Sequence, residues 1–266
     1  MGKGRSYLLR TYAKINLCLD VLFKRIDGFH EIDSLFQNVS LYDEMEVKIT
    51  HGQGRIFVES DTQIEENILY KVWNLSKSFE YDCYVKLKKN IPMGAGLGGG
   101  SSNAGAFLTL LAVTGVISQE RKNEIAPLVG SDVPFFLHGG TAIVGGRGEL
   151  IKRVTPLSGF RVDIFKPNFS ISTKEAYSKL NSKLFGKAPL KAVELYNAFK
   201  QHDLTAIQRG VYNIFESVIP DVLRTEIEMY RKDYPAALTG SGSAYFVIKD
   251  AGYYEFVDKA CEIVEN

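Results

Sequence analysis

The sequence has little cysteine, little histidine and no marked excess of either charge. Its 266 residues include three cysteines and four histidines, and 32 Lys and Arg balance 31 Asp and Glu. Cys18, Cys83 and Cys261 are widely spaced, and the histidines have no paired ligand spacing, which favours a reducing compartment and argues against a structural zinc site. Because a net charge of +1 creates no strong overall field, we expect no nucleic-acid partner.

Long apolar runs are also absent. No stretch approaches the roughly 20 apolar residues that span a bilayer, and basic residues interrupt the N-terminal segment, so we expect neither a membrane span nor a secretory signal. Gly2 and Ser6 match the myristoylation pattern, but so short a pattern recurs by chance. We therefore expect a cytoplasmic protein, and we predict no protein partner.

The overall composition is typical of a globular protein. With 45% hydrophobic and 24% charged residues, the chain is long enough for two cores. The composition changes after about Arg153, and no internal repeat is apparent. We expect two domains, at residues 1–153 and 154–266.

Hydrophobic periodicity predicts a mixture of strands and helices. Strands are expected over residues 7–23, 44–49, 55–60, 83–89, 141–144 and 160–168 and before Lys249, with the turn 50–54 connecting the second and third of these. Helices are expected over 65–79 and 103–115, from Ser118, in three or four places up to Tyr234, and over 253–264. Ser101 or Ser102 would be the N-cap of the second helix, and Gly115 would lie just past its end. The predicted fold class is α+β.

The most unusual stretch is "IPMGAGLGGGSSNAG", residues 91–105, between a strand and an apolar helix. Gly94, Gly96 and Gly99 satisfy G-x-G-x-x-G, but the chain returns to helix where a dinucleotide fold needs a second parallel strand. The stretch also lacks the Walker A lysine, and the chain lacks the H-R-D and D-F-G motifs of protein kinases. Backbone amides at the positive end of a helix suit a di- or triphosphate, although a glycine-rich helix start without a ligand is the plain alternative.

Other stretches are individually weak. Lys14 lies in an apolar strand with Asn16 two residues on, hence on the same face, although a lysine at a sheet edge would look the same. Asp132 in "GSDVPFF" could be a reactive carboxylate or only a helix cap. "GFHEIDSLFQ" could be ordinary packing around His30, and "LTGSGSAYF" could be a plain turn before a strand.

Taken together and in order, "AKINLCLDV", "DGFHEIDSLFQ", "EENILY", the glycine-rich stretch, "GSDVPFFLHGGTAIVGGRGE" and "LTGSGSAYF" resemble the GHMP kinases. The motifs run from Lys14 to Phe246, nearly the whole chain. The resemblance implies an N-terminal domain of the ribosomal-protein-S5 type that carries ATP, a ferredoxin-like C-terminal domain, and a cleft between them.

Within the family, the motifs are most similar to those of kinases that phosphorylate the 2-hydroxyl of 4-diphosphocytidyl-2-C-methyl-D-erythritol in the non-mevalonate isoprenoid pathway. The resemblance implies ATP and Mg²⁺ as cofactors, Asp132 as general base and Lys14 as the cation beside it; the metal ligands stay open. It also implies a nucleotide site and an acceptor site. The nucleotide site would comprise Asn67, Lys89, Pro92, Met93, Gly94, Ala95, Gly96, Leu97, Gly98, Gly99, Gly100, Ser101, Ser102 and Asn103, and the acceptor site Asn16, Phe29, His30, Thr173 and Tyr177.

One position departs from the family pattern, because Phe29 stands where the family usually has tyrosine. Phe29 and Tyr177 are expected to sandwich the cytosine that His30 reads, and stacking needs only the face of a ring. Two alternatives stay open from the sequence. The chain could be another kinase of this family, acting on homoserine or mevalonate, or a nucleotide-binding sensor without catalysis.

Overall fold

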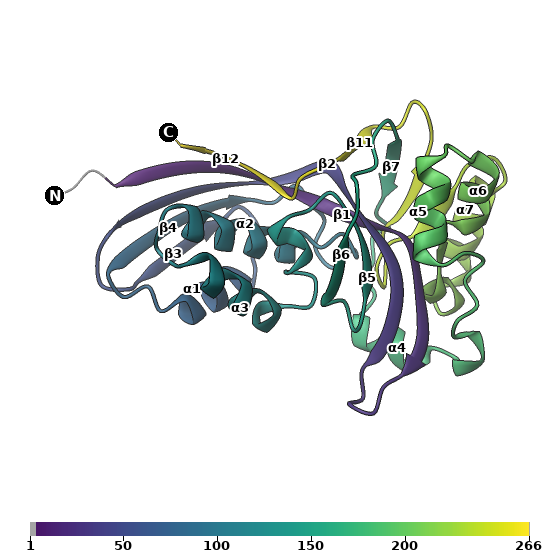
Figure 1. Ribbon diagram of the computed structural model, residues 1–266, viewed down its shortest axis with the longest axis horizontal. Helices are drawn as coiled ribbons and strands as arrows, with labels where there is room; N and C mark the ends of the chain where they lie inside the picture. Colours follow the sequence, from purple (N-terminus) through teal and green to yellow (C-terminus); the bar gives the residue numbers. More distant parts are fainter. Residues whose placement is uncertain (1–3, 266) are drawn as a thin grey trace.

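The computed structural model describes residues 4–265, and its frame is one long hairpin. Strands β1 (Arg5–Lys24) and β2 (His30–His51) pair in antiparallel fashion along almost their whole length and cross the molecule (Figure 1). The strands predicted over 7–23 and 44–49 are thereby confirmed. Gly2, on which the myristoylation pattern depends, lies outside the described residues.

At one end of the hairpin, further strands widen the sheet and helices cover one of its faces. Strand β4 (Tyr81–Lys88) pairs with β2 and, in parallel, with β3 (Ile56–Ser60). Helices α1 (Ile68–Ser76), α2 (Gly99–Val113) and α3 (Gln119–Val129) lie together over this sheet (Figure 1). β2 and β3, which the turn 50–54 connects in the chain, are therefore separated by β4.

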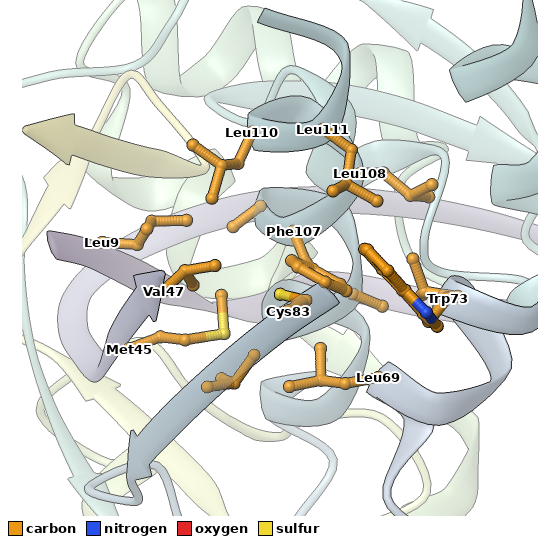
Figure 2. Close-up of a cluster of buried hydrophobic side chains, with 14 of the residues drawn as sticks. Leu9, Met45, Val47, Leu69, Trp73, Cys83, Phe107, Leu108, Leu110 and Leu111 are labelled. Atoms are coloured by element: carbon orange, nitrogen blue, oxygen red, sulfur yellow. The ribbon is translucent and has the colours of Figure 1, made fainter. Parts of the chain in front are cut away.

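The hydrophobic core of this end consists of side chains of the sheet packed against side chains of the helices. Leu9, Met45 and Val47 of the two long strands point toward Phe107 of α2 and Trp73 of α1, and all five are at most 3% exposed (Figure 2). Complete burial of such side chains stabilises a fold by about 1.5–3 kcal/mol each. Helix α2, which follows the glycine-rich stretch, is thus held firmly against the sheet.

At the other end, the sheet continues from β2 in the order β11 (Tyr254–Val257), β7 (Arg161–Phe165), β10 (Tyr245–Ile248) and β9 (Ala236–Leu238). Three of the four helices of this end gather beside it, and α4 lies near the tip of the long hairpin (Figure 1). These helices are α4 (Thr173–Lys179), α5 (Ala192–Lys200), α6 (Leu204–Gly210) and α7 (Asp221–Arg231). The three or four helices predicted before Tyr234 are confirmed.

Short elements connect the two ends. Strand β5 pairs with β2 and with β6, and β8 pairs in parallel with β1. The bounds are β5 Thr141–Gly145, β6 Leu150–Arg153 and β8 Tyr212–Asn213, with single 3-10 turns at Phe135–Leu137, Ser182–Leu184 and Ile214–Ser217.

The helix predicted over 253–264 is wrong, because this segment forms β11 and β12 (Cys261–Glu265). β12 pairs with β1, and β11 bridges β2 and β7. The hydrogen-bonding edges that these strands complete belong to distant parts of the chain, which the local apolar pattern cannot reveal. Strand formation here is decided by the partners.

The start of α2 also differs from the prediction. The helix begins at Gly99, and its N-cap is Gly98, at φ 70° and without a side-chain cap, whereas Ser101 and Ser102 lie inside the first turn. Ser102 cannot be the N-cap because it lies inside the helix, and its hydroxyl donates instead to the carbonyl oxygen of Tyr12 at 2.7 Å. The predicted end is confirmed, since Gly115 follows the C-cap Thr114 at φ 77°.

The α+β class is confirmed, and the division at residues 153 and 154 stays a prediction. Strands β11 and β12 from the second predicted domain pair with β2 and β1 of the first. Among residues 4–265, no helix is long and apolar enough to cross a membrane.

Candidate active site

Two cavities adjoin where the glycine loop, residues 94–100, meets the long hairpin. The larger cavity, about 550 Å³, lies between the hairpin, the segment around Asp132, the start of α4 and the turn 240–241. The loop cavity, about 370 Å³, lies over the glycine loop and the first turn of α2. Gly96 and Gly98 line both cavities. A ligand in each would therefore meet the other at these two glycines.

Residues of the glycine loop alternate between buried apolar side chains and glycines. Ala95 and Leu97 are 1% exposed and belong to a core cluster with apolar residues of β1 and β9. Between them, Gly96 and Gly98 adopt φ 79° and 70°, which L side chains rarely adopt. A Cβ on Gly98 would lie 2.8 Å from the Phe136 ring. The loop is anchored by two side chains and leaves its backbone bare toward the cavities.

The first turn of α2 points its amides toward the loop cavity without any acidic residue to offset them. The positive end of the helix dipole and these free N–H groups form a setting for phosphate oxygens. Of the two serines predicted to contact phosphate, Ser101 lines the loop cavity, whereas Ser102 is buried and bonded to Tyr12. The Ser102 amide also donates within the protein, to the carbonyl oxygen of Gly98 at 2.8 Å, and the phosphate contact of Ser102 stays a prediction.

Lys14 and Asp132 come together on the wall of the larger cavity. The Lys14 ammonium lies 3.6 Å from Oδ2 of Asp132, and the two side chains are 4% and 31% exposed. Burial holds the pKa of Lys14 below its ordinary value, and Asp132 opposes part of that shift. The pair thus combines a buried cation with a carboxylate that a bound hydroxyl can reach.

The alternative that Asp132 is only a helix cap is wrong, because the 3-10 turn that follows has Pro134 as its N-cap. That turn packs on α2 where Gly105 leaves no room for a side chain, since a Cβ there would lie 2.6 Å from Cβ of Phe136. The close packing fixes the segment that carries Asp132 relative to the glycine helix.

Asn16 connects Lys14 to the turn 240–241. Its Oδ1 accepts from the Lys14 ammonium at 2.7 Å and from the amide of Gly240 at 2.9 Å, and its Nδ2 donates to Ser34 at 3.0 Å. At 2% exposed, Asn16 orients the lysine from within the protein. Its predicted contact with the substrate stays a prediction.

The aromatic side chains gather at the far end of the larger cavity. His30 stacks on Tyr177 with ring centroids 4.9 Å apart, and the Arg147 guanidinium lies 4.8 Å from the centroid of the half-exposed Phe29 ring. Burial, helped by Lys24, lowers the pKa of His30, so its neutral ring offers one donor and one acceptor near pH 7. Burial and then Asp132 raise the pKa of Tyr177 to about 12, so its phenol stays protonated.

The remaining predicted residues also lie at the two cavities. Thr173 bonds to Ser241 at 2.8 Å on the wall of the larger cavity. Asn67 caps α1 by accepting from the amide of Leu69, and Lys89 is 5% exposed and paired with Asp43. Both line the loop cavity together with Pro92 and Met93.

Sequence reasoning missed several residues that the structure places here. Arg147 and Lys174 add two cations to the larger cavity, and Gly240 and Ser241 line it although their motif suggested no role. Asp43 is buried beside the loop cavity. A signal existed for Asp43, because it shares the strand face of the apolar residues Leu41, Met45 and Val47, where a carboxylate is unusual.

Comparison with known proteins agrees with this arrangement. The family of GHMP kinases N terminal domain matches residues 67–140, which include the glycine loop and Asp132. The chain is 57% identical over 99% of its length to the 4-diphosphocytidyl-2-C-methyl-D-erythritol kinase of Fervidobacterium nodosum, covering 98% of that protein. The chain belongs to this family of GHMP kinases.

Other relatives extend the same result. The 4-diphosphocytidyl-2-C-methyl-D-erythritol kinase of Thermotoga maritima is 41% identical, with 97% of each chain covered. A crystal structure of 4-(cytidine 5'-diphospho)-2C-methyl-D-erythritol kinase superposes with a TM-score of 0.77 at 28% identity, over 92% of this chain and 90% of that one. Homoserine kinase from Cytophaga hutchinsonii, at 16% identity, a TM-score of 0.69 and 97% of each chain covered, shares the fold of this GHMP kinase.

Proposed function

We propose that this GHMP kinase transfers the γ-phosphoryl group of ATP to the 2-hydroxyl of 4-diphosphocytidyl-2-C-methyl-D-erythritol. The observation that carries the proposal is the position of Lys14 and Asp132, 3.6 Å apart on the wall of the larger cavity, which adjoins the loop cavity at Gly96 and Gly98. Relatives named as this kinase, 40–57% identical over most of the chain, support this acceptor.

The residues divide the chemistry between them. ATP binds with its phosphates on the glycine loop and the amides of α2, and the acceptor fills the larger cavity. Asp132 takes the proton of the attacking hydroxyl, and Lys14 stabilises the negative charge of the phosphoryl group. Asn16 holds Lys14 in place through the bond at 2.7 Å.

The charges of the larger cavity suit this acceptor. Lys14, Arg147 and Lys174 outnumber Asp132 on its wall, which favours a ligand that carries a diphosphate. Stacking on Phe29 and Tyr177 and hydrogen bonding to His30 would hold the cytosine.

We include Mg²⁺ in the proposal. Among residues 4–265, no group of three or more His, Cys, Asp and Glu side chains forms a ready cage for an ion. Mg²⁺ in kinase sites is bound mainly through substrate phosphates, water and one or two carboxylates, so such a cage is not needed. Mg²⁺ would neutralise charge on the β- and γ-phosphates.

A coupled assay of ADP release tests the proposal across 4-diphosphocytidyl-2-C-methyl-D-erythritol, homoserine and mevalonate. We expect turnover with the first compound only, and Asp132→Asn should lower kcat by roughly 10²–10⁴ while ATP still binds. Asp221→Asn, which changes a carboxylate that is 92% exposed on α7, is the matched control and should leave kcat unchanged. Comparable turnover of homoserine or mevalonate, or ATP binding without turnover, would establish one of the two alternatives instead.

A further inference from the structure

Asp43 is a buried carboxylate that lines neither cavity. It accepts hydrogen bonds from residues on both sides of the glycine loop. Its side chain is completely buried, at 0% exposed. Oδ1 accepts from the backbone amides of Asn90 and Ile91, each at 2.8 Å. Oδ2 accepts from Nδ2 of Asn103 at 3.0 Å and is paired with the Lys89 ammonium. All four donors belong to the chain immediately before the loop or to the helix after it.

These bonds connect two segments that hold the glycine loop between them. Residues 89–91 lead from β4 into the loop, and Asn103 lies in α2 just after it. The Lys89 ammonium also donates to Oδ1 of Asn103 at 3.1 Å, and a Cβ on Gly99 would lie 3.2 Å from it. The Asp43 carboxylate in β2 thus holds both sides of the loop and keeps the Lys89 ammonium close to Gly99, the first residue of α2.

Lys89 is consequently not a mobile surface cation. Two of its three N–H groups are used by Asp43 and Asn103, so its position on the wall of the loop cavity depends on Asp43. Hydrogen bonds to ionised groups are roughly twice as strong as neutral ones, and misplacement of a binding group by about 1 Å can cost as much as a hundredfold in rate. The network has the strength to hold the loop in a nucleotide-binding geometry.

We infer that Asp43 is a positioning residue for the nucleotide, which acts through Lys89, Asn103 and the amides of residues 90 and 91. This inference rests on the proposed function, because it presupposes that the glycine loop binds ATP. Asp43 itself touches no substrate. Its loss should weaken nucleotide binding while leaving the acceptor site, on the other side of the loop, unchanged.

The chain contains a matched control for this test. Asp82 in β4 is also buried, and its Oδ1 accepts from the amides of Gln53 and Arg55 while its Oδ2 accepts from the Arg55 guanidinium. Its partners lie in the turn 50–54 and just before β3, and neither cavity includes them. In both Asp43→Asn and Asp82→Asn, the new amide nitrogen would face a cationic donor.

The experiment begins with the Kd of the parent protein for ADP, measured by calorimetry in the presence of Mg²⁺. A parent that binds no nucleotide contradicts the proposed function itself. If the parent binds, both substitutions should lower Tm. Only Asp43→Asn should raise the Kd for ADP and the KM for ATP, about tenfold or more, with the KM for the acceptor within about twofold.

Two results would overturn the inference while leaving the proposed function intact. Folded Asp43→Asn could bind ADP as tightly as the parent, or Asp82→Asn could weaken ADP binding by the same factor. Should Asp43→Asn not fold, Thr11→Val provides a milder variant, since Thr11 accepts from Nδ2 of Asn103 at 2.7 Å outside both cavities. It should weaken ADP binding a few fold, and unchanged binding would contradict the inference.

Discussion

The buried ammonium of Lys14 makes the pH dependence of the enzyme a test of its role. Burial lowers the pKa of Lys14 below the ordinary 10.5, and the role proposed for Lys14 in phosphoryl transfer needs its charged form. The alkaline limb of kcat/KM should therefore fall at a pH below 10.5. Lys14→Arg, whose guanidinium stays charged, should lose this limb even if its maximal rate is lower. If kcat/KM of Lys14→Arg still fell at the same alkaline pH, a group other than Lys14 would cause the fall.

The lowered pKa of Lys14 affects stability in the opposite direction, because the free energy of unfolding should rise with pH where the rate falls. Because the folded pKa of Lys14 lies below the unfolded one, the unfolded chain binds this proton more readily. The Lys14 contribution to the free energy of unfolding should thus rise with pH through the window between the two values. Loss of rate there cannot be attributed to unfolding caused by Lys14, which separates the catalytic limb from denaturation.

Phe29 gives a cleaner test of the acceptor base than Tyr177. Tyr177 packs on His30 and Phe215, so its removal would also leave a cavity, whereas Phe29 is 50% exposed. Phe29→Ala should raise the KM for the cytidyl acceptor roughly fivefold to a hundredfold, the worth of about 1–3 kcal/mol of stacking, with Tm and the KM for ATP almost unchanged. Phe29→Tyr keeps the ring and should be near neutral. An unchanged acceptor KM in Phe29→Ala would remove Phe29 from the base site.

At the scale of elements, the junction between the glycine loop and α2 can be tested at Gly100. Gly100 is exposed on the wall of the loop cavity, and a Cβ there meets no protein atom within 4 Å. Alanine or leucine inside a helix is favoured over glycine by up to about 1 kcal/mol. Gly100→Ala and the larger Gly100→Leu should therefore keep or raise Tm while ATP affinity falls in that order. Unchanged affinity in both would place the phosphates elsewhere.

Elements with local causes were predictable, and elements with distant causes were not. The glycine loop and the helix after it follow from nearby residues, because glycine alone suits the conformations of Gly96 and Gly98. The contact between Lys14 and Asp132 has no local signature, and only the family resemblance suggested it. β11 and β12 were missed because β1, β2 and β7 provide their pairing. Asp43 stands out locally as a carboxylate among apolar residues, but its partners could not be predicted because its donors come from other segments.

At the scale of the whole molecule, strands and core residues cross the predicted boundary near residue 153. β12 pairs with β1, β11 bridges β2 and β7, and one core cluster joins residues of the glycine loop to residues of α5 and β10. The predicted domains 1–153 and 154–266 would therefore each lose sheet partners if they were separated. The candidate active site includes residues of both, since the turn 240–241 lines the larger cavity together with Lys14.

This connection predicts that the two regions unfold together. Calorimetry should show one transition whose calorimetric and van't Hoff enthalpies agree, and an ATP analogue should raise its single Tm without splitting it. A chain shortened to end at Tyr253 provides the contrast, because it lacks β11 and β12 and leaves an edge of β1 unpaired. That variant should show a lower Tm and weaker nucleotide binding, since β1 positions Lys14 and anchors the loop through the bond from the Lys14 amide to the Leu97 carbonyl at 3.0 Å. Two separate transitions in the full chain, with only one moved by the ATP analogue, would instead mean that residues 1–153 and 154–266 are independent units whose shared strands contribute little to cooperativity.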